Sequence, residues 1–227
     1  MMAEMHDHAL LLRRIPYGDT SLICHFLTEQ HGRIALMARG AKRPKSVFRA
    51  SLEPLYALHI VWHPGRSGMG TLTDVQRGSA SLAVSQSMDG LELLAIASRL
   101  FHEGDHQGFE EVNASLQLLA SSHAQRLLMA VWQLLDAAGW LGDLSHCWQC
   151  GSSVEQEMYW KQAQLVCAPC GGGMAISTGL RKSIVAVLSG QQVRFSIADA
   201  NSWSEMIRQV LMRHDIRLTD SFKSERS

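Results

Sequence analysis

The chain has 227 residues, of which 46% are hydrophobic and 19% are charged, a composition typical of a folded globular protein and too apolar for a disordered one. Its 21 Lys and Arg residues balance 21 Asp and Glu residues, so the formal net charge is zero. The N-terminus lacks the apolar run and cleavage site of a secretory signal, and no segment has the roughly 20 apolar residues that a membrane span needs, so we expect a cytoplasmic protein with no membrane partner.

Residues 8–75 alternate between apolar and polar side chains in the way that half-buried strands do. The candidate strands are His8–Ile15, Ser21–Thr28, Arg33–Ala38, Leu52–Trp62 and Gly70–Val75. Turn residues such as Gly, Pro and Asp separate them. Five short strands in about 70 residues fit a small barrel better than a sandwich, so the sequence predicts a five-stranded barrel of the oligonucleotide-binding (OB) type at residues 1–79.

From residue 80 onward the apolar residues recur at helical spacing. The expected helices begin near Asp89-x-x-Glu92, span Phe109–Ala120, begin at the capping box Ser122-x-x-Gln125, and span Thr178–Leu188 and Ser202–Arg213. A cysteine-containing module at about residues 144–175 interrupts them. The expected fold is therefore α+β, with an OB-type barrel followed by a helical domain at residues 80–227.

Four of the five cysteines form two Cys-x-x-Cys pairs, Cys147/Cys150 and Cys167/Cys170, with sixteen residues between the pairs. This is the spacing of zinc sites in which each pair makes a tight turn and four thiolates complete a tetrahedral shell. A closed shell of four cysteines leaves no open position for a substrate, so we predict one structural Zn²⁺ per chain. Two redox-active dithiols are the alternative.

His102-Glu103-Gly104-Asp105-His106 matches the His-Glu-x-x-His pattern of zinc hydrolases, in which two histidines on one helical face bind the metal. A zinc-dependent hydrolase that uses His102, Glu103 and His106 is therefore an alternative function. However, Gly104 and Asp105 are poor helix-interior residues, and a helix end here would separate the two histidines. The chain also has no P-loop and no Gly-x-Ser-x-Gly motif, so we expect a protein that is not an enzyme.

Positive charge is concentrated near the N-terminus. Residues 1–77 carry ten basic and six acidic side chains, residues 78–160 carry two and ten, and residues 161–227 carry nine and five. The stretch from Gly32 to Arg49 contains six basic residues and no acidic one. A charge run is commonly a solvated face or a protected sheet edge, but a cluster without acids on an OB-type barrel favours binding of a phosphate backbone.

The predicted DNA contacts are Arg33, Arg39, Lys42, Arg43, Lys45 and Arg49, with Arg13 and Arg14 on the first strand as weaker candidates. Phosphate contacts position a strand without reading its bases, so binding should not depend on sequence. Six contacts should make affinity fall by about a thousandfold between low and moderate salt.

Several short motifs lie along the chain: RIPYGDTS at Arg14–Ser21, HGR at His31–Arg33, RGAKR at Arg39–Arg43, LEP at Leu52–Pro54, and AGW at Ala138–Trp140 before the two cysteine pairs. Together they resemble the RecO family of bacterial recombination mediators. The resemblance covers most of the chain and fades in the last 40 residues or so.

The resemblance implies an OB-type barrel, a helical domain and a zinc module that some members lack. It also implies a protein of DNA repair and recombination that binds single- and double-stranded DNA, anneals complementary strands and, with RecR, helps to load RecA onto DNA coated by single-strand-binding protein. Such a protein is nucleoid-associated. The acidic, apolar tail of single-strand-binding protein is expected to bind the helical domain, and the candidate binding site is Arg126, Leu127 and Val131.

Overall fold

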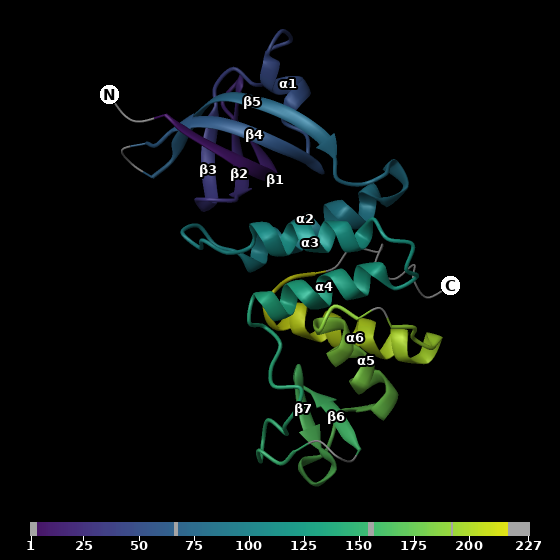
Figure 1. The fold of residues 1–227 in the computed structure, drawn as a ribbon. Coiled ribbons are helices and arrows are strands. Elements are labelled where there is room, and N and C mark those ends of the chain that lie inside the picture. Colours follow the sequence, from purple (N-terminus) through teal and green to yellow (C-terminus); the bar gives the residue numbers. More distant parts are fainter. Residues whose placement is uncertain (1–3, 66–67, 154–156, 192, 218–227) are drawn as a thin grey trace. The chain divides into compact units, whose positions relative to one another are not determined.

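The computed structural model describes residues 4–65, 68–153, 157–191 and 193–217, and its strands and helices confirm the expected α+β class (Figure 1). The chain divides into two compact units, Met1–Ser121 (unit 1) and Ser122–Ser227 (unit 2). Unit 1 therefore extends beyond the sequence-based boundary at residue 79 and includes two helices that follow the barrel. No helix in the described ranges is long and apolar enough to cross a bilayer.

A closed five-stranded barrel forms the first part of unit 1. Its strands are β1 (Met5–Tyr17), β2 (Ser21–Thr28), β3 (Gly32–Ala38), β4 (Tyr56–His63) and β5 (Gly70–Ala80). Their order is β1-β2-β3-β5-β4, and β4 returns to pair with β1, so the barrel has no open edge. The β3–β5 pairing is parallel and the other pairings are antiparallel. This arrangement confirms the predicted OB-type barrel.

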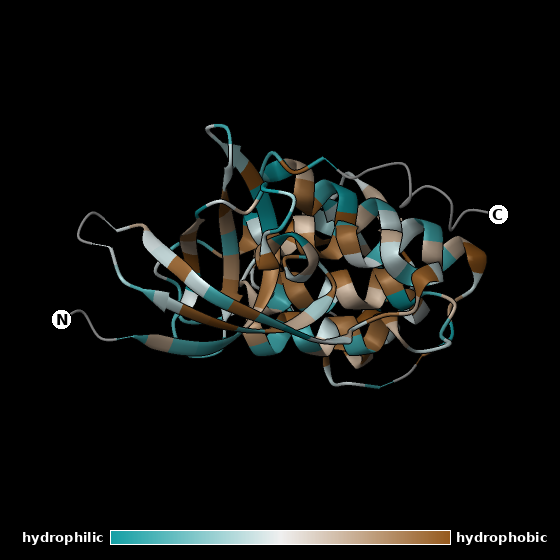
Figure 2. Cartoon of the chain, turned by 90° about the horizontal axis from the view of Figure 1, so that it is seen from above, coloured by the Kyte–Doolittle hydropathy of each residue, from teal (hydrophilic) through white to brown (hydrophobic). Residues whose placement is uncertain are grey.

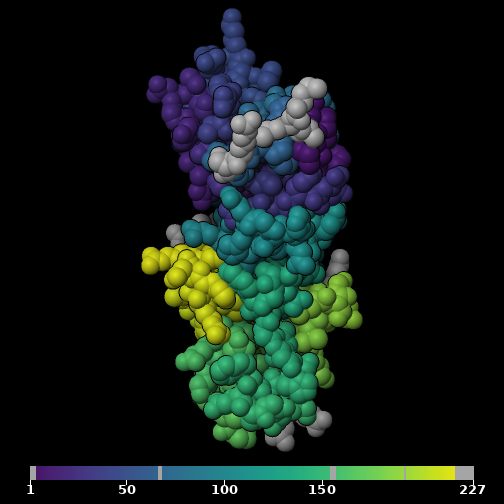
Figure 3. Space-filling model, turned by 90° about the vertical axis from the view of Figure 1, so that its left-hand side faces the viewer, coloured from purple at the N-terminus to yellow at the C-terminus, as the bar shows by residue number. Residues whose placement is uncertain are grey.

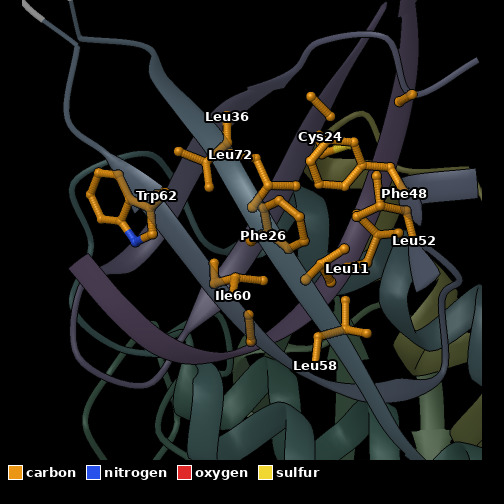
Figure 4. Close-up of a cluster of buried hydrophobic side chains, with 14 residues drawn as sticks. Leu11, Cys24, Phe26, Leu36, Phe48, Leu52, Leu58, Ile60, Trp62 and Leu72 are labelled. Atoms are coloured by element: carbon orange, nitrogen blue, oxygen red, sulfur yellow. The ribbon is translucent and has the colours of Figure 1, made fainter. Parts of the chain in front are cut away.

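Alternate residues of the strands point inward and form the barrel core. Apolar and hydrophilic positions alternate along the strands in Figure 2, and Figure 4 shows Phe26 among the inward-facing side chains. Phe26, Leu36 and Ile60 are fully buried, and burying each side chain of this size stabilises the fold by about 1.5–3 kcal/mol. Cys24 also lies in this core, where burial raises the pKa of its thiol to about 12.

The segment between β3 and β4 differs from the sequence-based expectation. The predicted fourth strand begins at Leu52, whereas β4 begins at Tyr56, because a short helix, α1 (Val47–Ser51), and a turn precede it. Leu55 in this turn has a positive φ of 64°, which ends any extended run. Phe48 and Leu52 are buried and lie beside the labelled Leu11 in Figure 4, so they anchor the segment to the core.

Two helices complete unit 1: α2 (Ser87–Leu100), preceded by the 3-10 turn η1 (Val84–Gln86), and α3 (Phe109–Leu119). A glycine allows α2 to pack closely on the chain beside it. A Cβ atom at Gly90 would lie 2.5 Å from Leu82 Cδ1 and 2.7 Å from Leu55 Cδ2, so any side chain there would have to displace these two leucine side chains. The Gln86 amide donates to the carbonyl of Leu119 over 2.8 Å, which links η1 to the end of α3.

Unit 2 combines helices with a small sheet of order β7-β6-β8. Its elements are α4 (Arg126–Ala137), β6 (Met158–Lys161), β7 (Gln164–Cys167), the 3-10 turn η2 (Ala168–Cys170), β8 (Met174–Ile176), α5 (Thr178–Leu188) and α6 (Ile197–Arg213). The sheet lies in the cysteine-containing module that the sequence predicts between the helices.

Two predicted helix starts in unit 2 are wrong. The box at Ser122 does not open α4, which begins at Arg126 after Gln125, a residue whose side chain makes no cap hydrogen bond. Helix α6 begins at Ile197 rather than near Ser202. The Ser196 hydroxyl accepts a hydrogen bond from the Asp199 N–H over 3.1 Å and caps the helix there.

Three fully buried tryptophans join the sheet of unit 2 to its helices. The ring centroid of Trp132 in α4 lies 6.4 Å from that of Trp160 in β6 and 6.0 Å from that of Trp203 in α6. Aromatic pairs at these separations stabilise a core beyond the area that they bury. The cysteine module is thus tied to the helices through Trp160.

Candidate nucleic-acid interface and metal centre

Residues 39–49, which we call the basic loop, are docked on the turn between β1 and β2. The Lys42 N–H donates to the carbonyl of Thr20 over 2.8 Å, and Lys42 Nζ donates to the carbonyl of Gly18 over 3.1 Å. Within the loop, the Arg43 N–H donates to the carbonyl of Gly40, which has a φ of 69°. These bonds hold the backbone of the loop in one conformation.

Two buried apolar residues hold the basic loop against the barrel, and its charged side chains are exposed. Ala41 and Phe48 are buried at 2% and 8% exposure, so the side chains between them face solvent. The loop and α1 project from the barrel in Figures 1 and 3. The exposed cations are Arg39, Lys42, Arg43, Lys45 and Arg49. In the part of the chain that the structure describes, no carboxylate lies within ion-pair distance of any of them. Their charge is available to an external anion.

Arg33 differs from the other predicted contacts because its guanidinium binds inside unit 1. Arg33 Nη1 donates to the carbonyls of Ser98 (2.8 Å) and Phe101 (2.5 Å), at the end of α2. The last carbonyls of a helix lack helical partners and attract cations. Burial lowers the pKa of Arg33, and the nearby Glu103 carboxylate opposes this. Arg33 therefore fixes α2 to the barrel, and the structure does not group it with the basic loop.

The two arginines of β1 also differ from each other. Arg13 is exposed. Arg14 Nη1 donates to the carbonyl of Leu52 over 2.6 Å and forms an ion pair with Glu53 Oε1 at 3.1 Å. The partner carboxylate reduces the charge that Arg14 offers to a ligand, which leaves Arg13 as the freer of the two.

Aromatic side chains lie beside the cations. Tyr17, at the end of β1, is 57% exposed and directly precedes Gly18, the residue that accepts from Lys42. The Arg77 guanidinium lies 4.6 Å from the ring centroid of Tyr56. Arg77 was not among the predicted contacts because it lies outside the run from Gly32 to Arg49, on the strand β5.

The four cysteines lie together, as their spacing predicts. Their sulfur atoms are all within 4.8 Å of one another, and Sγ of Cys150 lies 3.6 Å from Sγ of Cys167. Sulfurs around a tetrahedral zinc, with Zn–S of about 2.3 Å, are separated by about 3.8 Å. A turn closed by the Gly151 N–H on the Cys147 carbonyl presents one pair, and β7 with η2 presents the other. The cluster fits a metal ion of this size.

Backbone N–H groups favour the thiolate at Cys147, whereas neighbouring sulfurs disfavour it at Cys170. Burial raises the pKa of Cys147, but the N–H groups of Cys167, Cys150 and Gln149 outweigh it and lower the pKa to about 6. The neighbouring sulfurs of Cys150 and Cys167 raise the pKa of Cys170 to about 12. Four thiols this close cannot all ionise alone, whereas a central cation stabilises all four thiolates.

The His-Glu-x-x-His pattern is not helical. Helix α2 ends at Leu100, and Gly104 has a φ of 95°. The Asp105 carboxylate accepts a hydrogen bond from the His102 N–H over 2.7 Å, which folds the loop back. Across the described ranges, the four cysteines are the only group of three or more potential ligands whose donor atoms meet at metal-binding distance. His102, Glu103 and His106 therefore lack the geometry that the alternative hydrolase function requires.

Two of the three residues predicted to bind a partner tail in unit 2 are buried. Leu127 and Val131 are buried at 1% and 0% exposure, because both belong to the apolar face of α4, so they are not offered to a partner beside Arg126. An open pocket of about 440 Å³ lies elsewhere in unit 2, on α6 and the β6–β7 turn. It is lined by Gln162, Ala163, Arg208, Gln209, Met212 and Arg213.

Two family profiles together match most of the chain. The profile described as "Recombination protein O N terminal" matches residues 2–78, and that described as "Recombination protein O C terminal" matches residues 90–225. The chain belongs to the RecO family. Relatives named DNA repair protein RecO support this: that of Polynucleobacter asymbioticus is 31% identical over 221 residues, which cover 91% of this chain and 88% of that protein.

Two further RecO relatives match smaller parts of the chain. The DNA repair protein RecO of Laribacter hongkongensis is 34% identical over 141 residues (59% of this chain and 58% of that protein), and that of Glaesserella parasuis serovar 5 is 29% identical over 164 residues (69% and 68%). The N-terminal profile ends at residue 78, within β5, and the C-terminal profile begins at residue 90, whereas the two compact units divide after Ser121. The chain is thus a member of a DNA repair family.

Proposed function

We propose that this RecO family member binds single- and double-stranded DNA through the basic loop and anneals complementary strands. With RecR, it assists the loading of RecA onto DNA coated by single-strand-binding protein, at the nucleoid and without catalysis of its own. The observation that carries the proposal is the basic loop: five exposed cations that pair with no carboxylate of the described residues, on a backbone held by hydrogen bonds to the β1–β2 turn.

The fixed backbone supports tight but sequence-independent binding. Because the loop is hydrogen-bonded before DNA arrives, fewer rotatable groups lose freedom on binding. Lysine and arginine on phosphates supply affinity and register but no base readout. Neutralisation also explains annealing, since two strands on one basic surface repel each other less.

Tyr17 supports a contact to unpaired bases next to the phosphates. Its ring is exposed at the turn on which Lys42 is docked, so a base can stack there while its phosphate meets the loop. Base–aromatic stacking contributes about 1–3 kcal/mol per base. Tyr17→Ala should therefore weaken single-stranded DNA binding by at least about fivefold and affect duplex binding less.

We propose that the four-cysteine cluster holds one structural Zn²⁺. Cys147, Cys150, Cys167 and Cys170 would supply four thiolates, and the ion would supply the central charge that lets all four ionise. Because the module is joined to α4 through Trp160 and Trp132, the expected role is to stabilise unit 2.

We propose that the tail of single-strand-binding protein binds in the pocket on α6 and not at Arg126. Arg213 lines the pocket and Met212 is 54% exposed there, so it combines a cationic and an apolar group, whereas Arg208 on its wall is already ion-paired with Glu205. Arg213→Glu should weaken binding of an acidic, apolar tail peptide at least tenfold, whereas Arg194→Glu, at an exposed position in the same unit, should not. Equal losses in both variants would exclude the pocket.

Titration of DNA affinity against salt, with a strand-annealing assay beside it, tests the main proposal. Affinity for a mixed-sequence oligonucleotide should fall steeply with salt and should not change when the sequence is scrambled. A flat salt dependence, or affinity unchanged after removal of the loop charges, would overturn it.

A further inference from the structure

The outer face of the barrel carries a group of histidines at the seam where β1 meets β4. Ala9 and Leu11 of β1 point into the core, as do Leu58 and Ile60 of β4. By strand alternation, His6, His8 and His59 point outward. His6 and His8 are exposed and His59 is partly exposed.

The strand register brings the three rings together. His8 and His59 are direct cross-strand partners, and His6 lies two residues earlier on the same face of β1. The ring centroids of His8 and His59 are 5.5 Å apart, and those of His6 and His59 are 5.9 Å apart.

These separations are close to those of imidazoles that share a metal. With a metal–nitrogen distance of about 2.1 Å, two rings in a tetrahedral shell have centroids about 5 Å apart. In the conformations described, the histidine nitrogens do not converge, since only the four cysteines do so. Metal binding at this seam therefore requires the side-chain torsions of the three histidines to rotate until one nitrogen of each ring faces a common point.

We propose that His6, His8 and His59 form a second metal site, for a divalent transition-metal ion of the zinc and nickel class, which imidazole nitrogens bind well. The ion would connect β1 to β4, the pairing that closes the barrel. Because it binds the folded barrel and not the unfolded chain, it would stabilise unit 1 by mass action. The site is chemically distinct from the four-cysteine cluster of unit 2 and does not depend on DNA binding.

Metal counting on the full chain with its cysteine site filled tests this proposal. After equilibrium dialysis against micromolar ZnCl₂ or NiCl₂ at pH 7.5, the protein should hold two metal ions per chain, and the second should raise the melting temperature by roughly 5 °C. His6→Gln/His8→Gln, at two exposed positions, and His59→Asn should each reduce the count to one.

His102→Gln is the matched control, because His102 is 72% exposed in the same unit and lies outside the group. It should retain two ions. The ring protons of His6, His8 and His59 should shift together in NMR spectra when the second equivalent is added. A single metal ion in the parent protein, or a second ion retained by both histidine variants, would overturn the proposal.

Discussion

Replacing Lys42, Arg43 and Lys45 together with Gln should flatten the salt dependence of DNA binding. The structure leaves five cations exposed in the basic loop, and the three replacements leave Arg39 and Arg49. On single-stranded DNA each phosphate contact contributes about −0.7 to the slope of log affinity against log salt, so the slope should change from about −3.5 to about −1.4.

These slopes correspond to large differences in measured affinity. Between 50 and 200 mM salt, the affinity of the parent protein should fall about 130-fold and that of the triple variant about sevenfold. Fluorescence anisotropy of a labelled oligothymidine at five salt concentrations measures both slopes. Duplex DNA should give somewhat steeper values, near −4.5 and −1.8, because its counterion density is higher.

Arg33→Gln is the informative control because the sequence places Arg33 in the same run. Its guanidinium is hydrogen-bonded to the carbonyls of Ser98 and Phe101, so its loss should leave the salt slope unchanged. It should instead reduce the free energy of unfolding by about 3 kcal/mol, since two charge-assisted bonds are lost. Equal slopes for the parent and the triple variant, or a slope reduced in Arg33→Gln as in Arg43→Gln, would refute this reasoning.

Three further predictions concern stability. Removing the metal of the cysteine cluster with a chelator should lower the melting temperature, because unit 2 loses the ion at its cysteine module. The salt slope of DNA binding should stay the same. A changed slope would contradict the proposal that the cysteine cluster stabilises unit 2 while the basic loop binds DNA. Gly32→Ala should reduce the free energy of unfolding, measured in urea, by at least about 2 kcal/mol, because the position has a φ of 62° and a Cβ would lie 1.7 Å from the Asp105 carbonyl oxygen. Gly18→Ala is the control: its φ is 55°, but open space surrounds it, so its loss of stability should be smaller. Burial, with Arg33 and Arg13 nearby, lowers the pKa of His25 below 6.5, so the unfolded chain takes up the proton first and stability should fall as the pH drops from 7 towards 5. His25→Gln should reduce that fall, and an unchanged pH profile would show that another group is responsible.

Local patterns in the sequence determined much of the fold. The alternation of apolar and polar residues from His8 to Val75 was sufficient to predict five strands, because each strand has one face in the barrel core. The two Cys-x-x-Cys pairs were sufficient to predict the cluster, since the short spacing brings the two sulfurs of each pair together, and all four sulfurs lie within 4.8 Å of one another. Both are short-range signals, which is why they can be read without knowing the tertiary structure.

Only the tertiary structure decided which basic residues are already hydrogen-bonded inside the protein. Arg33 and Arg43 look alike in the sequence, yet the end of α2, more than 60 residues away, binds Arg33, whereas no carboxylate of the described residues pairs with Arg43. The same applies to Leu127 and Val131, which are buried in unit 2, and to His6, His8 and His59, whose rings are neighbours only because β4 returns to β1. Sequence specifies which charges and ligands are present, but long-range packing determines which of them are already satisfied.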